Sequence, residues 1–154
     1  MIGVQFLTSK TDQRLDKLGI SLQTGNSPVA NYVPFLLSGQ IPIIDGKPSY
    51  IGTVGENISI TEAIAAARQC CYSILALSRT ALDGDLDKIN KVVKITGYVA
   101  CTPNFTEHPK VINGASDLLV DVFGENGRHA RAAVGVVSLP LNVCVEIEAV
   151  FEIF

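Results

Sequence analysis

The last quarter of the chain, residues 127–154, constrains the fold more than any other segment. It contains two apolar runs suited to β-strands, which are joined at residues 139–142 (Leu-Pro-Leu-Asn). In the second run Glu146, Glu148 and Glu152 alternate with apolar residues, so a pleated strand would place these carboxylates on one face. The opposite face is predicted to point into the core and contains Val145, Ile147, Ala149, Phe151 and Ile153.

Two charged residues in these runs are the first candidates for a functional site. Arg131 lies near the start of the apolar run 130–137, and Glu146 lies in the run that follows. A guanidinium group at the start of one strand and a carboxylate row on its neighbour could hold a small anion beside an acid–base group. For both residues the alternative is an ordinary charge on a solvated strand face.

The composition narrows the class of protein. A chain of 154 residues is most simply one globular unit, and 47% hydrophobic against 18% charged residues suggests that a second copy covers part of its surface. The chain has twelve basic and fifteen acidic residues, so we do not expect it to bind nucleic acid. The N-terminus lacks the pattern of a secretory signal, and no apolar run approaches the roughly 20 residues that a membrane span needs. We therefore expect a cytoplasmic protein without a membrane partner.

The chain also lacks the common signatures of cofactor and metal sites. It contains no GxGxxG, GxxxxGK[ST], HExxH or CxxC motif, and His108 and His129 show no metal-ligand spacing. We therefore expect neither a cofactor nor a metal. The four cysteines lie inside periodic helix or strand patterns, which favours buried, reduced side chains over disulfides.

Hydrophobic periodicity and turn residues predict an α+β fold. The predicted order is helix, β-hairpin, helix, strand, helix, β-hairpin, with helices over residues 11–18, 59–82 and 109–123, a hairpin turn at 45–48, a strand over 89–101 and the two terminal strands. The first hairpin is expected to be interrupted at residues 38–40. One mixed sheet with both long helices on a single face follows, which leaves the other face for a second subunit.

Several segments carry a resemblance to a known family. Residues 129–136 (HARAAVGV), 139–140 (LP) and 145–149 (VEIEA) resemble the C-terminal signature of the Rid family, which is also called YjgF-like or endoribonuclease L-PSP-like. Residues 38–42 (SGQIP) and 31–33 (NYV) resemble two earlier blocks of the family, in the same order.

The likeness extends from about residue 29 to the C-terminus. We therefore predict an N-terminal extension with a short helix over residues 1–26 and a YjgF-like domain over residues 27–154. The resemblance implies a chorismate-mutase-like fold assembled as a homotrimer, with ligand clefts between subunits.

The resemblance also implies an activity. The best understood members hydrolyse reactive 2-imino or enamine acids to 2-keto acids and ammonia. By matching positions, Arg131 would hold the substrate carboxylate and Glu146 would orient or activate water. The resemblance further implies that Tyr32, Ser38 and Asn113 line the cleft. The backbone at Ala133 would contact the substrate.

This chain departs from the family pattern at several positions. Deaminases of the family commonly carry Ser-Cys or Thr-Cys after the arginine, whereas this chain has Ala132-Ala133. His129 stands where they have a proline, and Gly135 where they have an acidic residue. Three functions remain open: an imine deaminase, a non-catalytic binding protein for small carboxylic acids such as 2-keto acids, and, as a less favoured alternative, an endoribonuclease.

Overall fold

A computed structural model describes residues 9–22 and 37–154, and it contains one four-stranded mixed sheet with helices on one side. The helices are α1 (Lys10–Lys17), α2 (Ile60–Ala81) and α3 (His108–Phe123). The strands are β1 (Leu37–Gln40), β2 (Ile43–Ile44), β3 (Lys47–Pro48), β4 (Ile89–Ala100), β5 (Ala130–Val136) and β6 (Val145–Ile153). Three short 3-10 helices complete the list: η1 (Leu86–Lys88), η2 (Gly124–Gly127) and η3 (Pro140–Asn142).

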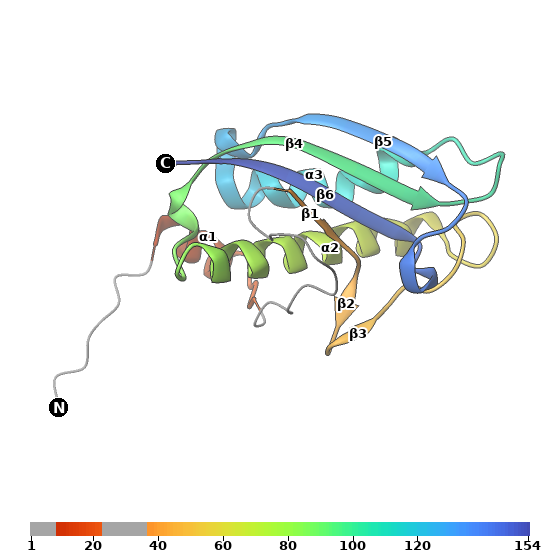
Figure 1. The fold of residues 1–154 in the computed structure, drawn as a ribbon, viewed down its shortest axis with the longest axis horizontal. Helices are drawn as coiled ribbons and strands as arrows, with labels where there is room; N and C mark the ends of the chain where they lie inside the picture. The colour runs from red at the N-terminus through yellow and green to blue at the C-terminus, as the bar shows by residue number, and fades with distance from the viewer. Residues whose placement is uncertain (1–8, 23–36) are drawn as a thin grey trace, which may run out of the picture.

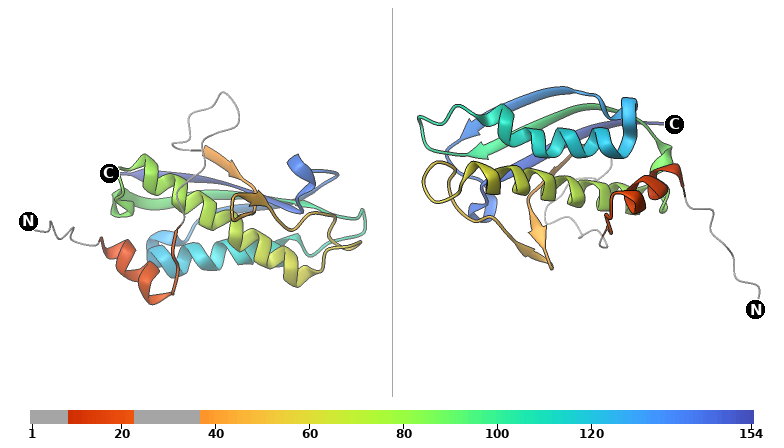
Figure 2. Two further views of the ribbon diagram at one scale, coloured as in Figure 1. Left: turned by 90° about the horizontal axis from the view of Figure 1, so that it is seen from below. Right: turned by 180° about the vertical axis from the view of Figure 1, so that it is seen from behind.

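The two long helices lie side by side on one face of the sheet, as predicted. Figure 1 looks onto the open face with α2 and α3 behind the strands, and the right view of Figure 2 shows both helices in front. The core lies between the layers and contains Ile74, Leu118, Ile95 and Ile147, which are almost completely buried. In the described part of the chain, α1, α2 and α3 all lie on this one side of the sheet. None of these three helices covers the other face, which we call the open face (Figure 1).

Helix α2 begins and packs as its sequence predicts. Ser59 and Glu62 form a reciprocal capping box, in which each side chain accepts a hydrogen bond from the backbone of the other residue. Small buried residues of α2 face the rest of the core, among them Ala63 and Ala67. A Cβ atom on Gly114 of α3 would collide with the Ile64 carbonyl oxygen, so a glycine allows the two helix backbones to approach closely.

The order of the strands corrects one prediction. The last two strands do not form a hairpin, because β4 lies between them in the order β1-β6-β4-β5. Strand β5 runs parallel to β4, and β6 runs antiparallel to both β4 and β1. The reason is that α3 connects β4 to β5 as a crossover, which returns the chain to the same end of the sheet before β5 begins.

Two smaller predictions are also changed. Residues 38–40 do not interrupt a strand, since they belong to β1 and pair with β6. The hairpin turn at Asp45-Gly46 is confirmed, with positive φ angles of 50° and 73°, but it joins strands of only two residues. Ile153 is predicted in the core, but its side chain is 45% exposed at the C-terminal end of β6.

Helix α1 packs against the main body of the protein. Leu15 is 2% exposed and belongs to the hydrophobic core, and Arg14 donates a hydrogen bond to the Val122 carbonyl. The predicted domain boundary between residues 26 and 27 lies outside the described residues and stays a prediction. Within the described ranges, no helix has the length and apolar character that crossing a bilayer requires.

Candidate functional site

Arg131 lies on the helix-facing side of β5. It is in register with Ile95 of β4, whose side chain is buried under the helices. The Arg131 Nη1 group donates hydrogen bonds to Asn113 Oδ1 (2.8 Å) and Ser116 Oγ (3.2 Å), both on α3. The Arg131 side chain is exposed in the single chain. Within residues 9–22 and 37–154, no carboxylate lies at ion-pair distance from this guanidinium group.

A hydrogen-bond chain leads from Arg131 to the backbone of η2. Ser116 Oγ lies 3.1 Å from His129 Nε2, and His129 Nδ1 lies 2.5 Å from the Gly127 carbonyl oxygen. A carbonyl oxygen only accepts, so Nδ1 carries the proton. In the neutral imidazole Nε2 is then the acceptor, and the Ser116 hydroxyl donates to it. The Ser116 oxygen thus accepts from Arg131 while its proton points at His129.

Glu146 lies on the open face of the sheet. It is in register with Tyr98 of β4, and its carboxylate occupies the space where a Cβ atom on Gly39 of β1 would be. The side chain is half-buried. Burial raises the pKa of Glu146 above its ordinary value, and the neighbouring charge of Glu148 adds to the effect. A carboxyl group with a raised pKa is suited to accept and return a proton near neutral pH.

The predicted carboxylate row is confirmed on this face. Glu146, Glu148 and Glu152 alternate with the buried residues of β6. The Tyr98 hydroxyl donates a hydrogen bond to Glu148 at 3.4 Å. Burial raises the pKa of Tyr98, as does the negative charge of Glu148, so this hydroxyl keeps its proton. The row is therefore a polar strip inside a face that also carries apolar side chains such as Val134.

Arg131 and Glu146 consequently lie on opposite faces of the sheet. Their strands are separated by β4, and their side chains point away from each other across the sheet plane. The expectation that a carboxylate row on the neighbouring strand would lie beside the guanidinium is wrong for a single chain. The alternation of two strands cannot show which of their faces coincide unless the pairing is known.

The other predicted site residues fall into three groups. Asn113 is brought directly to Arg131. Ala133 lies two residues further along the same face of β5, in register with Gly97. Ser38 belongs to β1, where its backbone pairs with Ala149, and Tyr32 lies outside the described residues.

Two residues of the Arg131 cluster were missed in the sequence, namely Ser116 and His129. A signal for both was present. Asn113 and Ser116 are three residues apart and share one face of a helix, and His129 and Arg131 are two residues apart and share one face of a strand. Only the crossover geometry of α3 and β5 shows that these two faces meet.

The cysteines have no disulfide partner, as predicted. Cys70, Cys71 and Cys144 are buried and Cys101 is partly buried. Burial raises the pKa of Cys71 to about 12 and that of Cys144 to about 11, so these thiols stay protonated and act as small apolar side chains.

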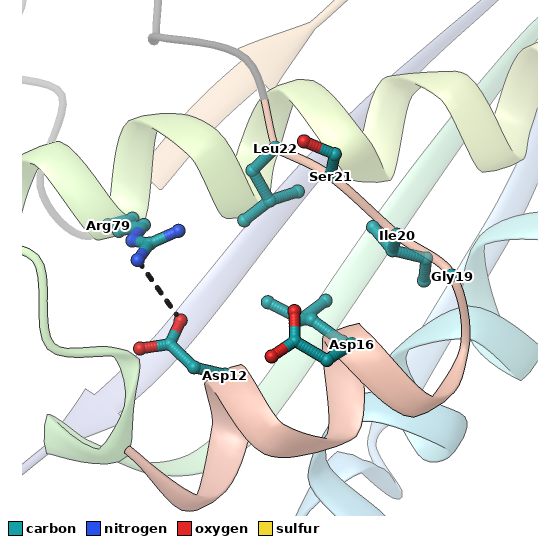
Figure 3. Close-up of a pocket in the computed structure, with 8 residues that line it drawn as sticks. Asp12, Asp16, Gly19, Ile20, Ser21, Leu22 and Arg79 are labelled. Atoms are coloured by element: carbon teal, nitrogen blue, oxygen red, sulfur yellow. Dashed lines mark ion pairs between the residues drawn. The ribbon is translucent and has the colours of Figure 1, made fainter. Parts of the chain in front are cut away.

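A separate cavity of about 300 Å³ lies beside α1 (Figure 3). It is lined by α1, by the turn after it and by Arg79 of α2, and the Arg79 guanidinium pairs with Asp12 at 3.3 Å. The lining contains none of the predicted site residues.

Comparisons with known proteins agree with this architecture. A family model described as "YjgF/chorismate mutase-like, putative endoribonuclease" matches residues 12–152. Protein TCP17 of Trypanosoma cruzi is 43% identical over 147 residues, which is 90% of this chain and 91% of that protein.

Two crystal structures are also similar. Protein Atu1372 of Agrobacterium tumefaciens, whose function is unknown, has 48% identity and a TM-score of 0.86, and the match covers 94% of this chain and 92% of that chain. A candidate endoribonuclease from Shewanella oneidensis has 31% identity and a TM-score of 0.87, with 93% of this chain and 99% of that chain covered. With its mixed sheet, its two packed helices and a match over nearly its whole length, this chain belongs to the YjgF/chorismate mutase-like family.

Proposed function

We propose that this protein hydrolyses reactive 2-imino acids and their enamine tautomers to 2-keto acids and ammonia, at sites formed where copies of the chain meet. The observation that carries the proposal is the arrangement of Arg131. Its guanidinium is held by Asn113 and Ser116, yet it lacks a carboxylate partner within the described ranges. A fixed and unneutralised guanidinium group is a binding site for a carboxylate ligand.

The chemistry makes modest demands on the protein. Water adds to the imine carbon, the resulting carbinolamine loses ammonia, and the carbonyl of the keto acid remains. The site must hold the carboxylate, place a water about 3 Å from the imine carbon and move a proton. Glu146 is suited to the proton transfer, because burial raises its pKa toward neutrality.

Arg131 and Glu146 lie on opposite faces of the sheet, and this arrangement limits how copies of the chain could form a shared site. Within one chain the sheet separates the two groups, so a site that uses both takes Arg131 from one copy and Glu146 from another. The open face, which carries Glu146 and partly exposed apolar side chains such as Val134, is the surface that a neighbouring copy would cover. A closed homotrimer would provide three equivalent sites of this kind.

A turnover assay tests the activity directly. An enzyme that consumes amino acids generates 2-iminopropionate or 2-aminoacrylate in the cuvette, and ammonia or keto-acid release is compared with and without this protein. We expect acceleration by the wild type and a loss of it in Arg131→Ala and Glu146→Gln. Arg128→Ala and Glu152→Gln are the matched controls, since Arg128 pairs with Glu125 and Glu152 contacts Asn90 at the surface.

A second candidate is a binding protein for small carboxylic acids. The observation in its favour is that Ala132 and Ala133, the two residues after the arginine in β5, have no polar side-chain group that could act on a substrate. Saturable binding of pyruvate that is lost in Arg131→Ala, together with no acceleration for any imino acid, would support this alternative over the enzyme.

The name of the family suggests ribonuclease activity as a third candidate. Glu146 and Glu148 place negative charge on the part of the open face beside Tyr98, where it would repel a phosphate backbone. Incubation with single-stranded RNA at low salt and without metal tests this directly. Cleavage that persists in Arg131→Ala and Glu146→Gln would favour a site elsewhere on the molecule.

A further inference from the structure

We infer that His129 and Ser116 are positioning residues, which hold the Arg131 guanidinium so that only its Nε–Nη2 edge is presented to a carboxylate. The inference deepens the proposed function and rests on it for the identity of the ligand. It concerns this chain's own residues, and the observation behind it is the hydrogen-bond chain from Gly127 through His129 and Ser116 to Arg131.

The Nη1 group of Arg131 is fully used inside the protein. A guanidinium Nη carries two hydrogens, and Nη1 has two acceptors, Asn113 Oδ1 and Ser116 Oγ. The end-on edge of the fork, which needs one hydrogen from each Nη, is therefore not available to a ligand. The side-on edge, made of the Nε hydrogen and one Nη2 hydrogen, has no acceptor in the described part of the chain and matches the two oxygens of a carboxylate.

Ser116 accepts from Arg131 only if its own proton points elsewhere. His129 provides that direction, since its Nε2 accepts the Ser116 proton at 3.1 Å. The imidazole in turn is oriented by the Gly127 carbonyl, which accepts from Nδ1 at 2.5 Å and so selects the neutral tautomer in which Nε2 is an acceptor. Each group in this series of hydrogen bonds therefore determines whether the next group acts as donor or acceptor.

The end of the hydrogen-bond chain at Gly127 is held by close packing. Gly127 is buried, and a Cβ atom on it would collide with the Leu119 carbonyl oxygen of α3, so η2 packs directly on the helix backbone. Ser116 lies on the same helix, which means that both ends of the hydrogen-bond chain are attached to α3. The packed helix α3 therefore fixes the orientation of the Arg131 side chain. An exposed arginine without such contacts samples many rotamers.

A serine inside a helix can donate to the carbonyl one turn earlier. Among the described residues, the Ser116 hydroxyl is hydrogen-bonded to Arg131 and His129. The proton is therefore available to His129, and substitution of His129 should release it to the helix backbone.

The first test measures the guanidinium itself and does not depend on catalysis. Nitrogen-15 NMR of the arginine side chains reports whether the Nη1 and Nη2 groups of Arg131 exchange by rotation. We expect separate signals in the wild type and in Ser116→Thr, which keeps the hydroxyl. We expect one averaged signal in Ser116→Ala and in His129→Phe, with unchanged thermal unfolding as evidence that these variants fold. Separate signals that persist in His129→Phe would overturn the inference.

The second test measures binding of pyruvate by calorimetry. Loss of one orienting hydrogen bond to a charged group should weaken binding about three- to tenfold in Ser116→Ala and His129→Phe, with Ser116→Thr close to wild type.

The two tests separate failure of the inference from failure of the proposed function. Averaged signals in the variants with wild-type pyruvate affinity would overturn the claim that the orientation serves binding. No pyruvate binding and no imine hydrolysis by the wild type would remove the proposed function, while the NMR result would still decide whether His129 and Ser116 hold Arg131.

Discussion

Arg131 and Glu146 lie on opposite faces of one β-sheet, with β4 between their strands. Arg131 points to α3 and is in register with buried Ile95, whereas Glu146 points to the open face beside Tyr98. A strand between them and opposite orientations prevent the two side chains from meeting on one small ligand. The proposed chemistry therefore depends on two copies of the chain, and this dependence can be tested.

Mixing two inactive variants should restore activity. Arg131→Ala and Glu146→Gln, unfolded together and refolded as mixed oligomers, would contain sites with an intact Arg131 from one copy and an intact Glu146 from the other. With random mixing, about one quarter of the sites would be intact, so we expect up to that fraction of wild-type imine hydrolysis. Each variant refolded alone is the control, and no recovery in the mixture would contradict a site shared between two copies.

Gly39→Ala should impair the role of Glu146 without straining the backbone. The new methyl group would occupy the position of the Glu146 carboxylate, and Gly39 does not adopt a positive φ angle. We expect a fall in kcat of about tenfold or more, because a displaced proton-transfer group loses its geometry. Stopped-flow or coupled ammonia assays measure it.

A double variant provides the control for Gly39. If the methyl group acts through Glu146, then Gly39→Ala should add little to the loss already caused by Glu146→Gln. Additive losses in the double variant would show that Gly39 serves another purpose, such as the pairing of β1 with β6.

Glu146→Gln should stabilise the fold at neutral pH while it removes activity. The folded pKa of Glu146 is raised above its ordinary value of 4.5, mainly by burial. Below pH 4.5 both folded and unfolded chains hold the proton, and the group has no effect. As the pH rises the unfolded chain ionises first, so the free energy of unfolding falls until the folded pKa is passed.

Urea unfolding at several pH values checks the sign of this effect. The Glu146→Gln variant should gain stability over the wild type at pH 7.5 and match it at pH 4. Glu152→Gln, on the exposed end of the same strand, should show no such difference. Equal stability of wild type and Glu146→Gln at both pH values would contradict the raised pKa.

Asp87→Asn should loosen the attachment of α1. The Asp87 carboxylate accepts hydrogen bonds from the backbone amides of Lys10 and Thr11 and from the Thr11 hydroxyl. Burial acts to raise the pKa of Asp87, but these hydrogen bonds outweigh it and lower the pKa below the ordinary value of 3.8. We expect Asp87→Asn to cost about 1–2 kcal/mol at pH 7.

The effect should depend on pH in the acid range. A depressed pKa contributes its full stability above about pH 3.8 and loses it as the pH falls through the lower folded value. The difference between wild type and Asp87→Asn should therefore shrink as the pH falls below about 3.8. Hydrogen exchange at the Leu15 amide measures it locally, and Asp83→Asn, at an exposed pair with Lys88, is the control.

The helices were predictable because their signals are local. The capping box at Ser59 and the spacing of Ala67, Cys71 and Ile74 identify α2 to within one residue at each end. The carboxylate row of β6 was equally local, since strand alternation alone places Glu146 and Glu148 on one face. The exposure of Ile153 at the end of β6 was not predicted, because strand alternation does not show where the buried part of a strand ends.

The site was predictable in its residue types and not in its geometry. Arg131, Asn113 and Glu146 were expected to act together, and the structure brings only the first two into contact. Ser116 and His129 were not expected at all, since a serine in a helix and a histidine before a strand are common in any chain.

By itself the sequence determined which segments become helices and strands, and which of their faces are apolar, because these properties depend on residues a few positions apart. Tertiary structure decided that β5 pairs with β4 in parallel, that Arg131 therefore faces α3, and that Glu146 faces the other way. The physical reason is that strand order arises from the crossover of α3 and from packing over the whole sheet, which join residues far apart in the chain.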